Sequence, residues 1–475
     1  MNVNEMMWQY FAEINKIPRP SGKEEKIRQY LIDFAKQNDL FYEIDEVGNL
    51  LIRKSATEGR ETEDAVVLQS HLDMVCEKEP DVEIDFEKDA IQTEIVGDWM
   101  KAKGTTLGAD DGIGLAMSMA ILASKDVSHP ALECLFTVDE EVGLLGASAL
   151  KSNWLEGKVL LNLDTEEEGD FCVGCAGGLD TLFRVQYQRE QLPDNYFCFE
   201  VSVGGLLGGH SGEDIHKGRG NAIKILAQYL QRVKEETALR VFDIQGGNLR
   251  NAIPRDAKAL VAVPSSYKET ARVQLNVFIA DMETQFREIE PSLKIDLSSK
   301  SKIEMCISPE VSDKLIDTLV DCPHGVLEMN QENPTLVQTS TNLAAITTNE
   351  TIILIETSQR SSLEDRKFWA CEQVIENFKL LNPKVEKGKD YLGWEPNFSS
   401  NILTKCKTKY LQMFGKEANV TVVHAGLECG IILKKYPKMD IISFGPTIQS
   451  PHSPIERLHI PSANRMMDFL VQVLN

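Results

Sequence analysis

Short apolar runs alternate with helical or turn-rich segments near both ends of the chain, and polar residues bound each run. The runs cover residues 65–68, 132–138, 159–163 and 439–444. Continuous short apolar segments are typical of strands in a sheet that is covered on both faces. Between the first two lies GIGLAMSMAILAS (112–124), which predicts a buried helix. The alternation indicates an α/β domain.

The first 40 residues predict two amphipathic helices around the turn sequence IPRPSGKEE. Pro18, Pro20 and Gly22 mark the turn between them. Ser21 followed by Glu24 has the spacing of a capping box, so we expect this pair to begin the second helix.

The middle of the chain has a different pattern, with alternating strands separated by amphipathic helices. Within it, NLRNAIPRDAKALVAVPSS (248–266) and TNLAAITTNETIILIETSQ (341–359) are similar in pattern, and each precedes a helix. This faint repeat predicts two similar α+β lobes. We therefore expect one domain formed by residues 1–181 and 391–475, interrupted by an inserted α+β lid domain at residues 182–390.

Length, charge and cysteine content narrow the classes of protein to consider. A chain of 475 residues is too long for one compact core. The formal charge of −23 disfavours nucleic acid and anionic membranes as partners. The start of the sequence has no pattern of a secretory signal, and no apolar run is long enough to cross a bilayer, so we expect a cytoplasmic protein. Cys172 and Cys175 have C-x-x-C spacing without a second ligand pair, which predicts buried thiols rather than a zinc finger.

Polar residues at five places follow or adjoin the apolar runs, where ligands of open α/β sheets collect. Each place alone has an ordinary explanation as a helix cap, a solvated acidic turn or a loop histidine. Together they supply two imidazoles and three carboxylates, which suit two zinc-like ions that share one carboxylate. The candidate ligands are His71, Asp110, Glu141, Asp164 and His452, with Asp73 and Glu140 beside them.

The chain also resembles a known family. The motifs are SHLDMV, GADDGIG, DEEVG, NLDTEE, GGHSG and SPHSPIE, in this order over nearly the whole chain. They are similar to those of the zinc metallopeptidases that include glutamate carboxypeptidase, bacterial di- and tripeptidases and carnosinases. HAGLECG at residues 424–430 marks the aminoacyl-histidine dipeptidase branch. The resemblance implies a zinc-peptidase domain with a mixed sheet flanked by helices.

The resemblance also implies a role for each candidate in the metal site. Asp110 matches the carboxylate that bridges two metals, with a cis peptide bond to Asp111. Glu141 and His452 match the other ligands of one metal, and His71 and Asp164 those of the second. Glu140 matches the general base and Asp73 the carboxylate behind His71. Two divalent ions per chain are expected; zinc is favoured, and cobalt or manganese would also suit these ligands.

The resemblance assigns four residues to substrate binding, three of them in the lid. His210 matches a histidine that approaches the oxyanion, Asn251 and Arg360 match groups that bind the terminal carboxylate, and Gly426 would line the pocket. A structural histidine in a glycine-rich loop and a surface salt bridge are the alternatives for His210 and Arg360. His216 and His424 receive no role.

These observations predict a metal-dependent dipeptidase that acts on Xaa-His and other dipeptides, with Glu140 as general base. An N-acyl amino acid deacylase of the same fold and a non-enzymatic binding protein are the alternatives. Serine hydrolysis has little support, because the chain has no G-x-S-x-G motif. The sequence leaves open the native metal, the preferred dipeptide, the state of the lid and whether the chain forms a homodimer.

Overall fold

The computed structural model describes residues 2–475, which divide into two compact units. The host unit contains the residues up to Cys175, Trp394–Val422 and Leu427–Asn475, and the inserted unit contains Ala176–Gly393 and Val423–Gly426. The sequence placed these borders at 181/182 and 390/391, and assigned residues 423–426 to the host. That short segment belongs to the inserted unit because the backbone N–H of Ala176 donates to the carbonyl of Val423.

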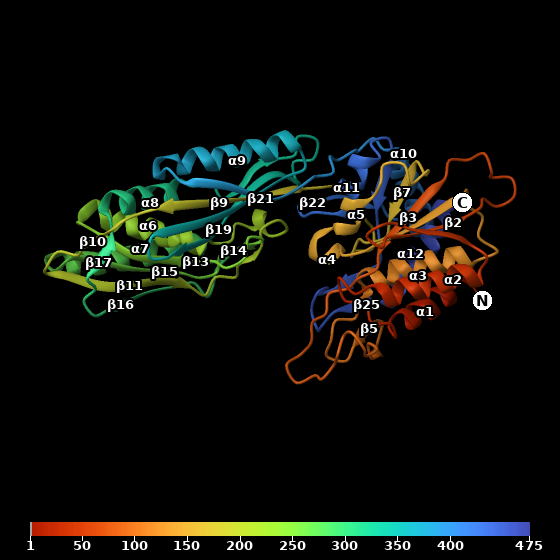
Figure 1. Cartoon of the computed structure of the whole chain (residues 1–475), viewed down its shortest axis with the longest axis horizontal. Coiled ribbons are helices and arrows are strands. Elements are labelled where there is room, and N and C mark those ends of the chain that lie inside the picture. The colour runs from red at the N-terminus through yellow and green to blue at the C-terminus, as the bar shows by residue number, and fades with distance from the viewer. Residues whose placement is uncertain (1) are drawn as a thin grey trace. The chain divides into compact units, whose positions relative to one another are not determined.

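The host unit is built on a mixed sheet with the strand order β1-β2-β6-β3-β7-β23-β8-β22 (Figure 1). The strands are β1 (Phe41–Ile44), β2 (Leu50–Lys54), β6 (Leu132–Thr137), β3 (Val66–His71), β7 (Val159–Asn162), β23 (Asp440–Ser443), β8 (Asp170–Cys175) and β22 (Asn419–Val423). The four central strands, β6, β3, β7 and β23, are parallel. They correspond to the four apolar runs, so that prediction is confirmed, and their carboxyl ends lie at one edge of the sheet.

Helices cover this sheet, and short strands extend the unit. The helices are α1 (Val3–Ile14), α2 (Glu25–Gln37), α3 (Ala109–Ala123), α4 (Glu140–Gly143), α5 (Leu145–Ala149), α10 (Asn401–Phe414), α11 (Glu428–Lys435) and α12 (Ile460–Leu474). A small sheet has the order β24 (Ile448–Gln449), β25 (Arg457–His459), β5 (Trp99–Ala102) and β4 (Thr93–Val96). Helix α3 is buried along almost its whole length and packs on α1 and β3, as its apolar sequence predicts.

The two N-terminal helices are present, but the predicted capping box of α2 is wrong. Glu24 is the N-cap residue, and no side chain caps this helix. The hydroxyl of Ser21 instead donates to Oδ2 of Asp73, at 2.7 Å. A capping box does occur at α1, where Asn2 and Glu5 hydrogen-bond each other's backbone N–H groups.

The inserted unit is one continuous sheet made of two lobes. The first lobe contains β11 (Tyr196–Gly204), β13 (Arg240–Gly246), β15 (Ala257–Pro264) and β16 (Lys294–Ser299) with helices α6 (Ala222–Glu236) and α7 (Lys268–Phe286). The second contains β9 (Gly177–Gln186), β18 (Gly325–Met329), β19 (Val337–Thr348), β20 (Ile352–Ser361) and β21 (Lys384–Tyr391) with helices α8 (Pro309–Asp321) and α9 (Glu364–Phe378). Two short pairs complete it: β10 (Arg189–Gln191) with β17 (Met305–Ile307), and β12 (Gly209–His210) with β14 (Ala252–Ile253).

The lobes join where β13 pairs with β19, through Gln245 opposite Thr347 and Gly246 opposite Ile346. Helices α6 and α8 contact each other across this junction, and the four long helices lie together on the sheet (Figure 1). One hydrophobic core runs through both lobes. The predicted two-lobed α+β architecture is therefore confirmed. Within residues 2–475, no helix is both long and apolar enough to span a membrane.

Candidate metal centre

The predicted ligands converge at the carboxyl edge of the host sheet. His71 is the last residue of β3, and Asp164 lies two residues beyond the end of β7. Glu141 is in α4, which follows β6, and Asp110 is in the first turn of α3. His452 comes from the loop between β24 and β25. Parallel strands thus bring together residues that are far apart in the sequence.

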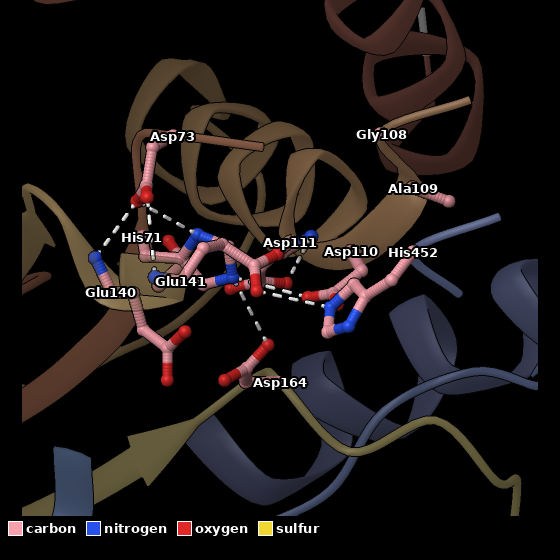
Figure 2. Close-up of polar contacts among 12 residues, drawn as sticks. His71, Asp73, Gly108, Ala109, Asp110, Asp111, Glu140, Glu141, Asp164 and His452 are labelled. Carbon is pink, nitrogen blue, oxygen red and sulfur yellow. Dashed lines mark hydrogen bonds and ion pairs between the residues drawn. The ribbon is translucent and has the colours of Figure 1, made fainter. Parts of the chain in front are cut away.

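Asp110 lies at the centre of the cluster, with one carboxylate oxygen toward each histidine (Figure 2). Its Oδ1 is 3.1 Å from Nε2 of His71, and its Oδ2 is 3.0 Å from Nε2 of His452. The peptide bond between Asp110 and Asp111 is cis, as the resemblance implied. Both residues have non-helical backbone torsions, so the chain turns sharply before α3 becomes regular.

A further carboxylate stands beside each histidine. Glu141 Oε2 is 3.0 Å from Nε2 of His452, and Asp164 Oδ1 is 3.5 Å from Nε2 of His71. The ligand atoms of His71, Asp110 and Asp164 lie within 4.8 Å of one another, and so do those of Asp110, Glu141 and His452. The two groups share Asp110, which is the arrangement of two cation sites with one bridging carboxylate.

The electrostatics of the cluster show how strongly it demands positive charge. Burial alone would lower the pKa of His71, but the charge of Asp164 and the contact with Asp110 raise it well above its ordinary value. Hydrogen bonds with Asp110 and Glu141 raise the pKa of His452 to about 11. Burial raises the pKa of Asp164 to about 7. The carboxylates around the two histidines therefore favour positive charge at positions that also suit cations.

Asp73 supports the site from behind. Its Oδ1 is 3.3 Å from Nδ1 of His71, and its two oxygens accept hydrogen bonds from the backbone N–H groups of Glu140 and Glu141. Although burial opposes it, hydrogen bonding to His71 lowers the pKa of Asp73 to about 2. An anionic Asp73 fixes the orientation of the His71 ring and connects it to the start of α4.

Glu140 lies beside the ligands without taking part in the two shared groups. Its carboxylate points to the same side of the cluster as Asp164 (Figure 2). Burial raises the pKa of Glu140 well above its ordinary value, as does the nearby charge of Asp164. A carboxyl group whose pKa is raised holds a proton more readily than an ordinary carboxylate does, which suits a general base.

Two charged residues that the sequence reasoning missed hold the loop before Asp110. The carboxylate of Glu456 accepts hydrogen bonds from the backbone N–H groups of Leu107, Gly108 and Ala109, at 2.7 to 3.0 Å. The guanidinium of Arg19 is 1% exposed and donates to the carbonyls of Leu72, Asp73 and Gly108. Arg19 therefore joins the loop that follows His71 to the loop that precedes Asp110.

Gly108 shows how closely these groups pack. Its φ is +67°, and a Cβ atom there would lie 2.6 Å from Nη2 of Arg19 and 2.8 Å from the sulfur of Met74. Only glycine fits this position without displacing its neighbours. Arg19 lies in the turn sequence IPRPSGKEE and Glu456 ends the motif SPHSPIE, but neither pattern assigns these two residues a role.

In the inserted unit, the predicted substrate residues gather at the ends of β12, β20 and β21. Arg360 is 6% exposed and donates from Nη1 to the hydroxyl of Tyr391 at 2.6 Å. Gly426 packs against the same tyrosine ring, where a Cβ atom would lie 2.7 Å from Cε2. His210 pairs with Ala252 in the β12–β14 ladder, which places it next to the exposed Asn251. Burial and the charge of Arg360 lower the pKa of His210.

His424, which the sequence left without a role, belongs to this group. Its Nε2 is 2.7 Å from the hydroxyl of Ser340, and burial together with Arg360 lowers its pKa to about 3. Within residues 2–475, Nε of Arg360, Nδ1 of His424 and the hydroxyl of Ser211 are buried without a hydrogen-bond partner. Buried polar atoms usually have partners, so these atoms indicate a place for a polar ligand. Cys172 and Cys175 are buried and form no disulfide bond with any cysteine of residues 2–475.

Comparisons with known proteins give four matches. Residues 201–290 match the family model described as a peptidase dimerisation domain. The chain is 40% identical over 468 residues to the cytosol non-specific dipeptidase of Escherichia coli, covering 98% of this chain and 96% of the relative. Its structure is similar to that of aminoacylhistidine dipeptidase from Vibrio alginolyticus, with a TM-score of 0.91, 38% identity and coverage of 100% and 98%. Aminopeptidase PepT from Bacillus cereus shares the fold, with a TM-score of 0.58, 16% identity and coverage of 99% and 98%.

Proposed function

The chain belongs to the family of the cytosol non-specific dipeptidase, and from this premise we propose that it is a metal-dependent dipeptidase that cleaves Xaa-His and other dipeptides. The observation that carries the proposal is the position of Asp110, whose two oxygens face two histidines that each have a further carboxylate beside them. A hydrolase with one divalent cation on each side of a shared carboxylate needs this set of donors.

The residues present fit two divalent cations. Oε1 of Glu141 is buried without a hydrogen-bond partner among residues 2–475, and the three carboxylates crowd together at the edge of a sheet. His71 and Asp164 would hold one ion, Glu141 and His452 the other, and Asp110 both. When bound, such ions lower the pKa of water and polarise a carbonyl group. Zinc suits these oxygen and nitrogen donors, as do cobalt and manganese.

The chain's own residues then account for the proton transfers. Glu140 accepts a proton from the attacking water and returns it to the leaving amine, which general base and acid catalysis by one carboxyl group allows. Asp73 holds His71 and the backbone of Glu140 in place through its four contacts. The backbone hydrogen bond to Asp73 restricts where the Glu140 carboxylate can lie.

We assign the binding of the substrate's terminal carboxylate to Arg360 and Asn251, with Gly426 lining the pocket. The unpartnered Nε of Arg360 supports this assignment, because the guanidinium can offer a second N–H beside the one used by Tyr391. His210, which the low pKa keeps neutral, can donate one N–H to an oxyanion.

A combined measurement of metal content and activity tests the proposal. The purified protein would be assayed with β-alanyl-histidine, other dipeptides and N-acyl amino acids, before and after chelation. We expect about two metal equivalents per chain, cleavage of dipeptides, loss of activity with a chelator and recovery with zinc. Faster turnover of N-acyl amino acids than of dipeptides would show that N-acyl amino acids are the substrate class. A protein that binds no metal would refute the assignment of a metal-dependent dipeptidase.

We also propose a cytosolic location and a homodimeric assembly for this chain. The name of the Escherichia coli relative supports a cytosolic location for this chain. The match of residues 201–290 to a peptidase dimerisation domain supports a homodimer. Sedimentation of the purified protein over a range of concentrations would measure the assembly, and a monomer at all concentrations would exclude the dimer.

A further inference from the structure

A row of polar side chains crosses the centre of the host sheet just below the metal centre. Gln69 on β3 and Asn162 on β7 are paired in register, and Asn162 is also paired with Ser443 on β23. All three side chains are at most 2% exposed. A position in the core of a parallel sheet is usually apolar, so three adjacent polar residues need a reason to be there.

The hydrogen bonds of this row all run in one direction. The hydroxyl of Ser443 donates to Oδ1 of Asn162, and Nδ2 of Asn162 donates to Oε1 of Gln69 at 2.6 Å. Nε2 of Gln69 donates to Oε2 of Glu428, at 2.7 Å. The row thus ends on a carboxylate from helix α11, which accepts the final hydrogen bond.

Glu428 also connects the row to the neighbouring strand. The hydroxyl of Thr137, the last residue of β6, donates to the same Oε2 atom at 2.7 Å. Glu428 is 2% exposed, and among residues 2–475 its second oxygen, Oε1, has no hydrogen-bond partner. Both hydrogen bonds arrive at Oε2, which therefore acts only as an acceptor. It thus determines which way the amide of Gln69 points, and through Gln69 the amide of Asn162.

Three strands linked through Glu428, β3, β7 and β6, carry part of the metal centre a few residues later. Gln69 precedes His71 by two positions, and Asn162 precedes Asp164 by two. Thr137 precedes Glu140 by three. The row therefore links the ends of three strands whose next residues must keep fixed relative positions. Metal and catalytic groups tolerate displacements of only about 0.5 Å, so such a link has functional value.

We infer that Glu428 is a positioning residue of the metal centre: by accepting hydrogen bonds from Gln69 and Thr137, it fixes the strand ends that carry His71, Asp164 and Glu140. This inference rests on the proposed function. A purely structural role, in which Glu428 only satisfies buried donors, is the competing explanation, and it predicts loss of stability without a change in the metal centre.

The test compares two substitutions of Glu428 in the full chain. Glu428→Leu removes the acceptor that Gln69 and Thr137 share. It leaves them only the longer contacts, each 3.3 Å, from Gln69 Nε2 to the Thr137 hydroxyl and from that hydroxyl to the Ser70 carbonyl. We expect at least a tenfold fall in kcat for a dipeptide with less than a threefold change in KM. The affinity for zinc, measured by competition with a chromophoric chelator, should fall at least tenfold. Glu428→Gln should recover most of both losses, because one carbonyl oxygen can accept both hydrogen bonds.

Glu133 provides a matched control. It is 3% exposed, lies near the opposite end of β6, and accepts hydrogen bonds from Arg53 and from the backbone N–H groups of Glu156 and Gly157. We expect Glu133→Leu to lower the Tm while kcat and zinc affinity stay within twofold of the wild type. The control separates the effect of removing a buried glutamate from the effect of disrupting the hydrogen bonds of the row.

The outcomes distinguish the inference from the proposed function. A Glu428→Leu protein with a lowered Tm, but wild-type kcat and zinc affinity, would overturn the positioning role while leaving the dipeptidase assignment intact. A wild-type protein that binds no zinc, cobalt or manganese would overturn both. If Glu428→Leu does not fold, Thr137→Val removes one donor at constant shape. It should lower kcat and zinc affinity at least threefold, and unchanged values would count against the inference.

Discussion

Nε2 of His452 lies 3.0 Å from Oδ2 of Asp110, although 342 positions separate the two residues in the chain. The other oxygen of Asp110 is taken by His71, so each histidine has its own oxygen of one shared carboxylate. A side chain in this position couples two ligand groups. Loss of one outer ligand should therefore weaken the binding of one ion directly. It should weaken the binding of the other ion through Asp110.

Replacing His452 with alanine should reduce the metal content from about two equivalents to about one. Activity should fall by more than about 100-fold, which exceeds the usual effect of losing a group behind a ligand. Metal analysis and the dipeptide assay on one preparation would measure both. His459→Gln alters a histidine of the same segment outside the cluster and should retain both ions. Full activity of His452→Ala would contradict the assignment.

Glu140→Gln should separate binding from proton transfer. The amide cannot accept a proton, so kcat should fall by about 10² to 10⁴, the usual contribution of a general base. Glu140 also lies within 4.8 Å of ligand atoms of His71 and Glu141, but it is outside the two groups that share Asp110. Since each ion keeps its three ligands in those groups, metal content should stay near two equivalents. Glu167→Gln, in the acidic turn after β7, is the control and should keep wild-type kcat. A Glu140→Gln enzyme with full kcat would require another base.

Arg360→Met should mainly affect recognition of the substrate carboxylate. Removing a bidentate charged partner is expected to raise KM by roughly 10- to 100-fold. The decisive comparison uses a dipeptide and its C-terminal amide: the effect of the substitution should largely disappear with the amide. Arg250→Met changes an exposed arginine paired with Glu356 and should leave both KM values unchanged. Equal effects on acid and amide would indicate that Arg360 acts on something else.

Glu456→Gln should destabilise the loop before Asp110. Both carboxylate oxygens of Glu456 accept hydrogen bonds from backbone N–H groups. In glutamine an NH2 group replaces one of these oxygens, and it cannot accept a hydrogen bond from the N–H group that it faces. Hydrogen bonds to charged groups contribute about 1.5 to 3 kcal/mol each, so we expect a loss of about 2 kcal/mol in the free energy of unfolding. Urea unfolding of metal-free protein would measure it. Wild-type stability would show that the loop holds its shape without this carboxylate.

The inserted unit should lose stability in mild acid because of His324. Nδ1 of His324 accepts hydrogen bonds from the backbone N–H of Leu343 and the amide of Asn221, and burial lowers its pKa to about 4. Between about pH 6.5 and 4 the unfolded chain binds a proton that the folded chain does not. Stability therefore falls as the pH falls through this window, by on the order of 3 kcal/mol in all.

Urea unfolding from pH 7 to pH 4 would measure this dependence. His324→Gln should reduce the slope by up to about 1.4 kcal/mol per pH unit, since one titrating group is removed. His216→Gln, at an exposed position of the same unit, should not change it. An unchanged slope in His324→Gln would show that other groups cause the acid sensitivity.

The sequence predicts the central strands and the ligand cluster because both depend on short local patterns. An apolar run followed by an acid or histidine is visible in the chain, and parallel strands bring such ends together. Hydrogen bonds between a side chain and a distant part of the backbone have no such pattern in the sequence. Glu456 binds N–H groups some 348 positions away, and the hydroxyl of Ser21 is taken by Asp73, which is why its predicted capping role is wrong. Glu428 lies within the HAGLECG motif and beside the apolar sequence CGIIL, but neither pattern assigns it a role.

The two main connections between the units run side by side. Cys175 and Trp394 exchange a pair of backbone hydrogen bonds of 2.9 Å, at the points where the chain leaves and re-enters the host unit. An insertion whose ends already touch places little demand on the surrounding fold, and such sites accept new segments most readily. In evolutionary terms, the host fold can gain, lose or enlarge the segment between these two residues as a module. A peptidase scaffold could in this way acquire a second lobe by duplication while the strands that carry its metal ligands remain unchanged.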